Sequence, residues 1–162
     1  MKNLSYLSGN IFSGMPLDRV DHLRGDKVWL EKQLADPRSR FIPVWNQESI
    51  IYVENHPHAA IHGLNRLDGL IGGVLDDDVP LALLGITRDV SRIAYFAIDL
   101  SHLPREALVE CYEGGNLMDL RDSVQIIPEI EAAILSYARG LMYWHRHNRY
   151  CSVCGHKNIS SK

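Results

Sequence analysis

The chain has 162 residues, of which 46% are hydrophobic and 23% are charged, and its formal net charge at pH 7 is −3. A chain of this length buries about two-thirds of the surface that it exposes when unfolded, so it can fold as one domain without disulfide bonds. The low net charge argues against DNA binding. No apolar run approaches the roughly 20 residues that span a membrane, and the first residues do not resemble a signal peptide, so we expect a cytoplasmic protein.

Two kinds of pattern follow one another in the first third of the chain. Apolar residues recur at approximately helical spacing and predict a helix over residues 26–35. Asp26 can cap its first turn, and Asp36-Pro37 ends it because the residue before a proline avoids the helical region. Residues 40–45 and 49–54 then alternate in polarity and are rich in β-branched and aromatic side chains, which predicts a β-hairpin.

The middle of the chain predicts a second hairpin, over residues 80–87 and 92–100. Its second strand carries apolar residues on both faces, which indicates a sheet that is covered on both sides. A short helix is predicted over residues 104–111, with Pro104 at its first position, and a short strand over residues 117–120.

The strongest pattern lies over residues 127–147 and predicts a long helix opened by Pro128. Acidic residues follow its start and basic residues its end, where each sign of charge suits the helix dipole. Large apolar side chains recur at steps of four and three residues, which defines one packed face. We interpret this face as core rather than as the lining of a cofactor site. Its members are Ile130, Ile134, Tyr137, Leu141 and Trp144.

Together the elements predict an α/β (α+β) fold. Both hairpins are expected in one sheet, and the long helix is expected to pack on it through Ile130, Ile134, Tyr137 and Leu141. A domain boundary is expected near His147, where the helical pattern ends.

A cysteine pair follows the long helix. Cys151 and Cys154 are two residues apart and precede Gly155, which permits a tight turn. Two thiolates at this spacing can bind one zinc ion. A redox disulfide is the other chemistry typical of this spacing, but such a motif normally opens a helix, whereas this one follows a helix.

The pair supplies only half of the four protein ligands that structural zinc requires. Within the chain, His145, His147 and His156 are the candidates for the rest. A second cysteine pair beyond Lys162 is the alternative that we favour. The remaining cysteine, Cys111, lies far from the pair and reads as a small buried apolar residue.

Two further clusters of polar residues have weaker chemical meaning. His56, His58 and His62 could in principle bind a metal, but no carboxylate or cysteine follows at a typical spacing, so we interpret them as loop residues. Residues 76–78 are three aspartates that could bind a hard cation, although a solvated turn is the more usual role of such a run before a strand.

Several motifs of the chain, in this order, resemble one family. The NADH pyrophosphatases are Nudix hydrolases that split NAD(H) into a mononucleotide and AMP, and some members remove NAD caps from RNA. The resemblance covers the chain from about Leu23 onward, and the join of a Trp-His helix end to Cys-x-x-Cys-Gly is its most specific part. The matching motifs are Asp36-Pro37-Arg38-Ser39-Arg40-Phe41, Asp119-Leu120-Arg121, Ala138-Arg139-Gly140-Leu141, Trp144-His145 and Tyr150-Cys151-Ser152-Val153-Cys154-Gly155-His156.

The resemblance implies a domain organisation and a set of site residues. Residues 1–147 would form a degenerate Nudix-like domain, and residues 148–162 would begin a zinc ribbon that continues into a catalytic Nudix domain absent from this chain. Cys151 and Cys154 would be the first two zinc ligands, completed beyond the chain. Arg121 would contact an NAD(H)-like dinucleotide, although an ion pair of Arg121 with a neighbouring aspartate, Asp119 or Asp122, is equally open. The resemblance also implies a homodimer.

The catalytic motif of the family is not met. That motif is a glycine followed by glutamates around an Arg-Glu pair, which hold magnesium or manganese against the pyrophosphate. Arg105-Glu106 is the only Arg-Glu pair here, and Ser91, Ala97 and Val109 stand where the glycine and two of the glutamates belong. We therefore expect no catalytic residue in this chain, and no hydrolysis by it alone.

Two functional hypotheses remain from the sequence. The first is an accessory domain of an NAD(H) pyrophosphatase that serves assembly and forms part of the substrate site. The second is a free-standing module that binds a nucleotide or a protein.

Overall fold

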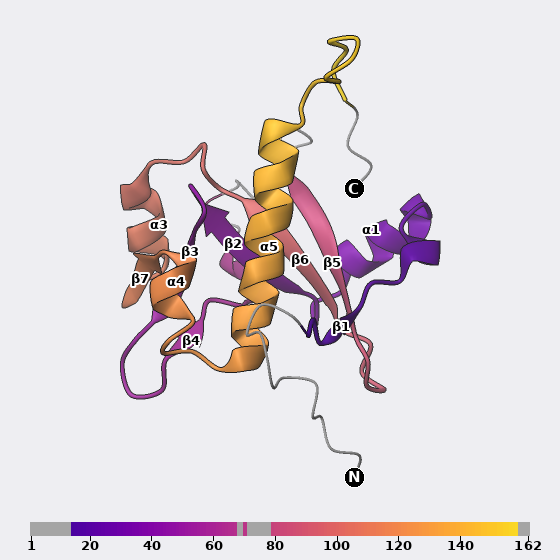
Figure 1. Ribbon diagram of the computed structural model, residues 1–162. Helices are drawn as coiled ribbons and strands as arrows, with labels where there is room; N and C mark the ends of the chain where they lie inside the picture. The colour runs from indigo at the N-terminus through magenta and orange to yellow at the C-terminus, as the bar shows by residue number, and fades with distance from the viewer. Residues whose placement is uncertain (1–13, 68–69, 71–78, 159–162) are drawn as a thin grey trace.

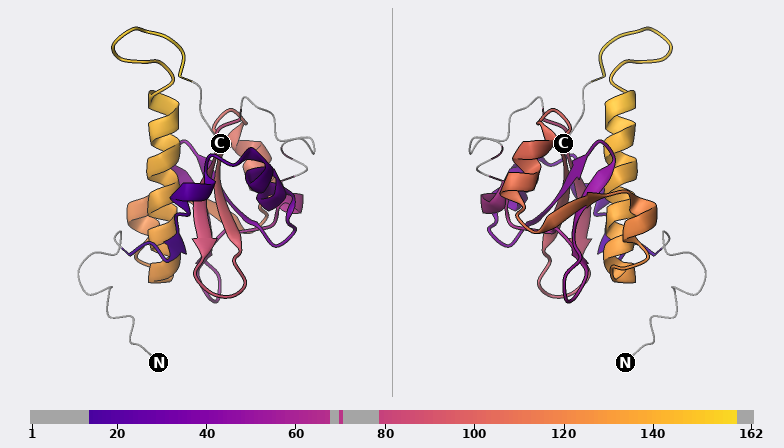
Figure 2. Two further views of the ribbon diagram at one scale, coloured as in Figure 1. Left: turned by 90° about the vertical axis from the view of Figure 1, so that its right-hand side faces the viewer. Right: turned by 90° about the vertical axis from the view of Figure 1, so that its left-hand side faces the viewer.

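A computed structural model describes residues 14–67, 70 and 79–158. A mixed seven-stranded sheet lies between two layers of helices (Figures 1 and 2), which confirms the predicted α+β fold. The strands are β1 (Leu17–Asp18), β2 (Arg40–Trp45), β3 (Glu48–Tyr52), β4 (His58–Ala59), β5 (Leu81–Thr87), β6 (Ala94–Asp99) and β7 (Gly115–Met118). The helices are α1 (Lys27–Ala35), α3 (Arg105–Cys111), α4 (Leu120–Ser123) and α5 (Glu129–His147), with short 3-10 turns η2 (Asp21–Leu23) and η3 (Leu64–Arg66).

The order of the strands in the sheet is β1-β5-β6-β2-β3-β4, and β7 pairs with β3. Both predicted hairpins are present as the antiparallel pairs β2–β3 and β5–β6. The two hairpins are joined through β2 and β6, which run parallel. No helix of the described residues has both the length and the apolar character that a bilayer span requires.

The predicted helices α1 and α3 form where local signals place them. The Asp26 side chain accepts a hydrogen bond of 3.0 Å from the Trp29 backbone N–H and so caps α1. Pro104 is the residue that precedes α3 rather than its first helical residue, a shift of one position.

Strand β6 carries apolar residues on both faces, which explains why helices cover both sides of the sheet. Ala97 belongs to a core on the side of α4 and α5. Phe96 and Ile98 belong to a second core on the side of α1 and α3. The two side views in Figure 2 show α5 on one side of the sheet and α1 on the other. The prediction of a strand covered on both faces is therefore confirmed.

The packed face of α5 agrees with the predicted one in part. Ile134 is buried, and Tyr137 and Leu141, although half-buried, pack against the same core, whereas Ile130 and Trp144 are each 55% exposed. The buried face also contains three alanines that the prediction did not include, whose small side chains let the helix approach closely. The buried residues of α5 are Ala132, Ala133, Ile134, Leu135, Ala138 and Met142.

The short strand predicted over residues 117–120 is displaced toward the N-terminus. Strand β7 ends at Met118, and Asp119 then starts the short helix α4, which the sequence did not indicate. The Asp119 carboxylate accepts a hydrogen bond of 2.8 Å from the Arg121 backbone N–H, so this residue acts as a helix cap and not as part of a strand.

Strand β1 joins the sheet through a close approach at Gly85. A β-bulge in β5 brings Gly85 against β1, where a Cβ atom would lie 2.5 Å from the Asp18 carbonyl oxygen. The bulge leaves the Leu83 and Leu84 carbonyls free to accept hydrogen bonds from the Arg24 guanidinium. This arrangement holds the segment before η2 at the sheet edge beside α5.

Candidate functional site

Arg121, the predicted substrate contact, lies in the first turn of α4. Its backbone N–H is bonded to Asp119, while its side chain is exposed. Among the described residues the Arg121 guanidinium takes part in no ion pair, so the predicted pairing with Asp119 or Asp122 is not seen. An exposed, unpaired guanidinium offers several donors to an anion such as a pyrophosphate.

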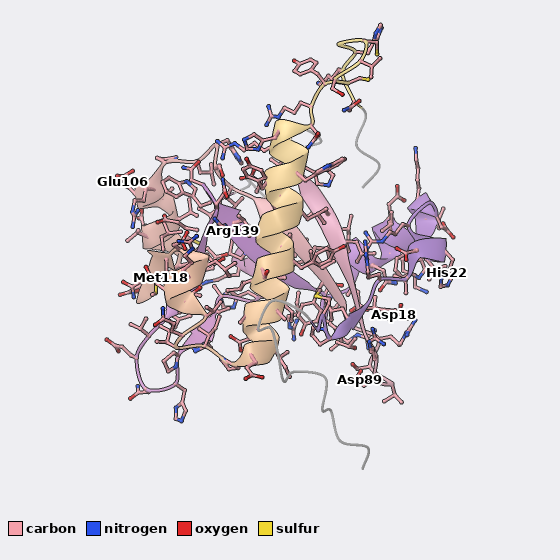
Figure 3. The ribbon with its side chains drawn as sticks, in the orientation of Figure 1. Asp18, His22, Asp89, Glu106, Met118 and Arg139 are labelled. Carbon is pink, nitrogen blue, oxygen red and sulfur yellow. The ribbon has the colours of Figure 1, made fainter. Side chains whose placement is uncertain are left out.

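A second arginine reaches the same helix from α5. Arg139 Nη2 lies 3.8 Å from Asp119 Oδ2, which is a long ion pair, and its Nε atom is buried without a hydrogen-bond partner. Figure 3 labels Arg139 beside α5. Asp119 thus caps the helix that carries Arg121 and also faces Arg139. The sequence contained Arg139 only as part of a family motif, because a partner 20 positions away in the chain leaves no local pattern.

The arginine of the segment that aligns with the catalytic motif makes contacts within the protein. Arg105 pairs with Glu48 at 3.6 Å, and its guanidinium lies 5.8 Å from the centre of the Trp45 ring. Glu106 is exposed on α3, and Figure 3 shows it on the opposite side of the molecule from Asp89. Val109, at a glutamate position, is 49% exposed. These side chains do not converge on one point.

The described residues do not fit a catalytic magnesium or manganese ion. No group of three His, Cys, Asp or Glu side chains within this part of the chain is placed to hold one metal. A site for such a hard cation needs several oxygen ligands around one position.

The cysteine pair lies in a turn that suits a thiolate. Cys151 N–H donates to His156 O at 2.7 Å, and Gly155 N–H, at a residue with φ of 70°, donates to Cys151 O at 2.9 Å. The backbone N–H of Cys154, and then that of Val153, hydrogen-bonds Cys151, which lowers the pKa of its thiol. Stabilised thiolates are the form that binds zinc, so the pair fits half of a structural zinc site.

The histidines near this turn do not complete the set of ligands in the described residues. His147 stacks on Tyr143 at 3.9 Å, and its Nδ1 lies 2.8 Å from the Tyr143 carbonyl oxygen. Burial lowers the pKa of His145. His156 is exposed in the turn, where its backbone carbonyl accepts the bond from Cys151.

The other histidine cluster is spread through an aromatic layer. His56 lies in a loop, but His58 is in β4 and stacks on Tyr52, and His62 stacks on Tyr112 at 5.7 Å. Burial lowers the pKa of His62, helped by the nearby positive charge of Arg66. The reading of all three as loop residues is therefore wrong for His58. Ring stacking on Tyr52 and Tyr112 positions His58 and His62.

Two remaining sequence expectations have different outcomes. Cys111 is half-buried, its thiol donates to the Arg66 carbonyl at 3.4 Å, and burial raises its pKa, as befits an unreactive thiol. The aspartates at 76–78 lie outside the described residues.

Comparison with known proteins identifies the family of the domain. A family model described as "NUDIX-like: NADH pyrophosphatase-like rudimentary NUDIX domain" matches residues 38–144, which is more than half of the chain. No curated protein matches the sequence. The matched range contains the altered catalytic segment and both arginines next to Asp119. With a Nudix-like sheet and helices, and with Ala97 and Val109 at two glutamate positions of the catalytic motif, this chain belongs to the family of NADH pyrophosphatase-like rudimentary Nudix domains.

Proposed function

We propose that this chain is the non-catalytic amino-terminal domain of an NAD(H) pyrophosphatase, an enzyme that hydrolyses NADH or NAD+ to a nicotinamide mononucleotide and AMP. The observation that carries the proposal is the altered catalytic segment. Its arginine, Arg105, is held by Glu48 and Trp45, and Ala97 and Val109 stand at glutamate positions. The domain then serves assembly of a homodimer and contact with the dinucleotide, while a separate Nudix domain binds magnesium or manganese.

Arg121 is the proposed contact with the substrate. Its guanidinium is exposed and in no ion pair among the described residues, so no protein partner has to be displaced before an anion binds. A guanidinium remains charged at every physiological pH and can donate two parallel hydrogen bonds to phosphate oxygens. Asp119 supports this role by fixing the first turn of α4 through the Arg121 N–H.

Cys151 and Cys154 are the proposed first ligands of a zinc ribbon that begins at residue 148. Two further ligands would come from sequence beyond Lys162. Structural zinc would fix the turn after α5 and thereby the direction in which the chain continues. The lowered pKa of Cys151 supports the proposal because zinc binds the thiolate form.

A comparison of three proteins tests the proposed function. The 162-residue chain, the full-length enzyme and the enzyme without residues 1–147 are assayed for NADH, NAD+ and NAD-capped RNA hydrolysis, and their masses in solution are measured. We expect no turnover by the 162-residue chain, and weaker binding of substrate and loss of the dimer when residues 1–147 are removed. Turnover by the 162-residue chain that a chelator abolishes would refute the proposal. An enzyme unchanged by the deletion would favour a free-standing binding module instead.

A further inference from the structure

A groove runs along α5 beside the segment that enters β1. Its volume is about 500 Å³. Small-molecule sites in proteins typically enclose about 300 to 1,000 Å³ and are lined by aromatic and apolar side chains with a few polar groups. The groove has this composition, since Met15, Tyr137, Leu141 and Trp144 line it together with Arg19. Three of these residues belong to the helix face that the sequence assigned to the core.

Arg19 gives the groove its charge. It is the only charged residue among the described residues that line the groove. Its guanidinium carbon lies 5.5 Å from the centre of the Tyr137 ring, and its side chain makes no hydrogen bond or ion pair within the described part of the chain. The guanidinium donors are thus free, and no carboxylate of the groove offsets their charge.

The aromatic wall of the groove is partly exposed, although Tyr137 also packs against the core. Trp144 is 55% exposed, and its indole N–H donates no hydrogen bond among the described residues. Trp45 differs, because its indole N–H donates to the Leu103 carbonyl at 2.9 Å. An exposed indole that lines the same groove as a free guanidinium suits a molecule with a flat ring and a negative charge.

We propose that this groove binds a small molecule that combines a flat aromatic ring with an anionic group, the chemistry of a nucleoside monophosphate. The ring stacks on Trp144, and the anionic group accepts hydrogen bonds from Arg19. The groove is distinct from the Arg121 region at α4, so this site does not depend on the proposed function.

NMR spectroscopy of the full 162-residue chain tests the proposal. The three tryptophans of the chain yield three indole N–H signals, and Trp144→Phe identifies the one in the groove. We expect millimolar AMP to shift the Trp144 signal and to leave that of Trp45, which is bonded to Leu103, in place. Adenosine, which lacks the charge, and inorganic phosphate, which lacks the ring, should each bind at least roughly tenfold more weakly than AMP.

Two variants and a matched control locate the site. A Cβ atom on Gly140 would meet nothing within 4 Å, so Gly140→Leu can begin a side chain at the wall of the groove and reduce its free volume. We expect it to abolish AMP binding while the Tm stays equal or rises, because leucine favours a helix more than glycine. Arg19→Gln should weaken AMP binding roughly tenfold and adenosine binding little. The control is Arg66→Gln, since Arg66 also lies over a tyrosine ring, that of Tyr112, but outside the groove.

Three results would overturn the proposal. The first is the absence of a Trp144 shift with millimolar AMP. The second is equal weakening by Arg19→Gln and Arg66→Gln, which would indicate attraction by general charge. The third is AMP binding that appears only after removal of residues 1–13, which would assign the groove to that segment of the chain.

Discussion

Two regions of the domain, the β6–α3 segment and the α4–α5 side of the sheet, differ in the contacts that their side chains make. The first lies where the family places its catalytic motif, yet Arg105 is held in an ion pair and Leu108 is buried in the core. The second was expected to hold both the packed face of α5 and the substrate contact Arg121, and it holds the unpaired Arg121 and the long ion pair of Arg139. The position of a helix in a fold therefore does not reveal its chemistry, because packing needs only its buried face.

The largest effect is expected where the chain leaves α5. In the full-length protein, Cys151→Ser should lower zinc affinity by several orders of magnitude, because structural zinc binding contributes roughly 10 kcal/mol or more and depends on all four ligands. The 162-residue chain should bind zinc weakly. Competition with a chromophoric chelator measures both affinities, and Cys111→Ser is the control because its half-buried thiol lies far from the pair in sequence. Tight binding of one zinc by the 162-residue chain would contradict the half-ribbon proposal, and one zinc per two chains would mean that two copies share it.

The next effect concerns the contribution of the buried face of α3 to the free energy of unfolding. Leu108 is 1% exposed, so Leu108→Ala should lower the free energy of unfolding by about 2–5 kcal/mol. Val109→Ala, on the exposed side of the same helix, should change it by less than about 0.5 kcal/mol. Urea denaturation followed by circular dichroism measures both values. Similar values for the two variants would mean that α3 is not packed as described.

The two arginines provide the most direct comparison of the two regions. In the full-length enzyme, Arg121→Ala should lower kcat/KM for NADH about tenfold, because a charge-assisted hydrogen bond contributes roughly 1.5–3 kcal/mol. Arg105→Ala should leave kcat/KM within about twofold, because its exposed ion pair contributes at most about 1 kcal/mol to stability. Steady-state kinetics distinguishes them. Equal losses of kcat/KM in the two variants would indicate that the β6–α3 segment also contacts the substrate.

The smallest effect concerns pH and the contact between His62 and α3. Burial holds the pKa of His62 below its ordinary value of 6.5, so the unfolded chain binds a proton more readily than the folded one. The free energy of unfolding should thus fall as the pH drops through about 6.5 toward the lower folded pKa. In His62→Phe the decrease between about pH 7 and about pH 5 should be shallower. Identical pH dependence of the free energy of unfolding in the unchanged chain and in His62→Phe would exclude His62 as the source of the decrease.

Local patterns predicted the elements of this protein well because their signals lie within a few residues. The cap at Asp26, the stop at Pro37 and the two hairpins are confirmed. The same kind of signal failed at residues 117–120, because a strand pattern gives no weight to one capping side chain. Asp119 ends the extended segment there and starts α4.

The candidate site could be predicted only in part. Arg121 was identified through a family motif and the cysteine pair through its spacing, and the structure shows the exposed guanidinium and the turn that lowers the pKa of Cys151. Arg139 and Arg19 were not singled out. Their partners, Asp119 and Tyr137, are 20 or more positions away, so no spacing rule relates them.

The sequence by itself determined the fold class, three of the helices, both hairpins and the replacement of two catalytic glutamates, because each depends on residue identity and short-range spacing. Only the tertiary structure decided which face of α5 is buried. A periodic pattern counts large apolar side chains, whereas packing on a sheet favours the side that can approach most closely. The alanines of α5 lie on the side that meets the sheet, and Tyr137, Leu141 and Trp144 line a groove beside Arg19.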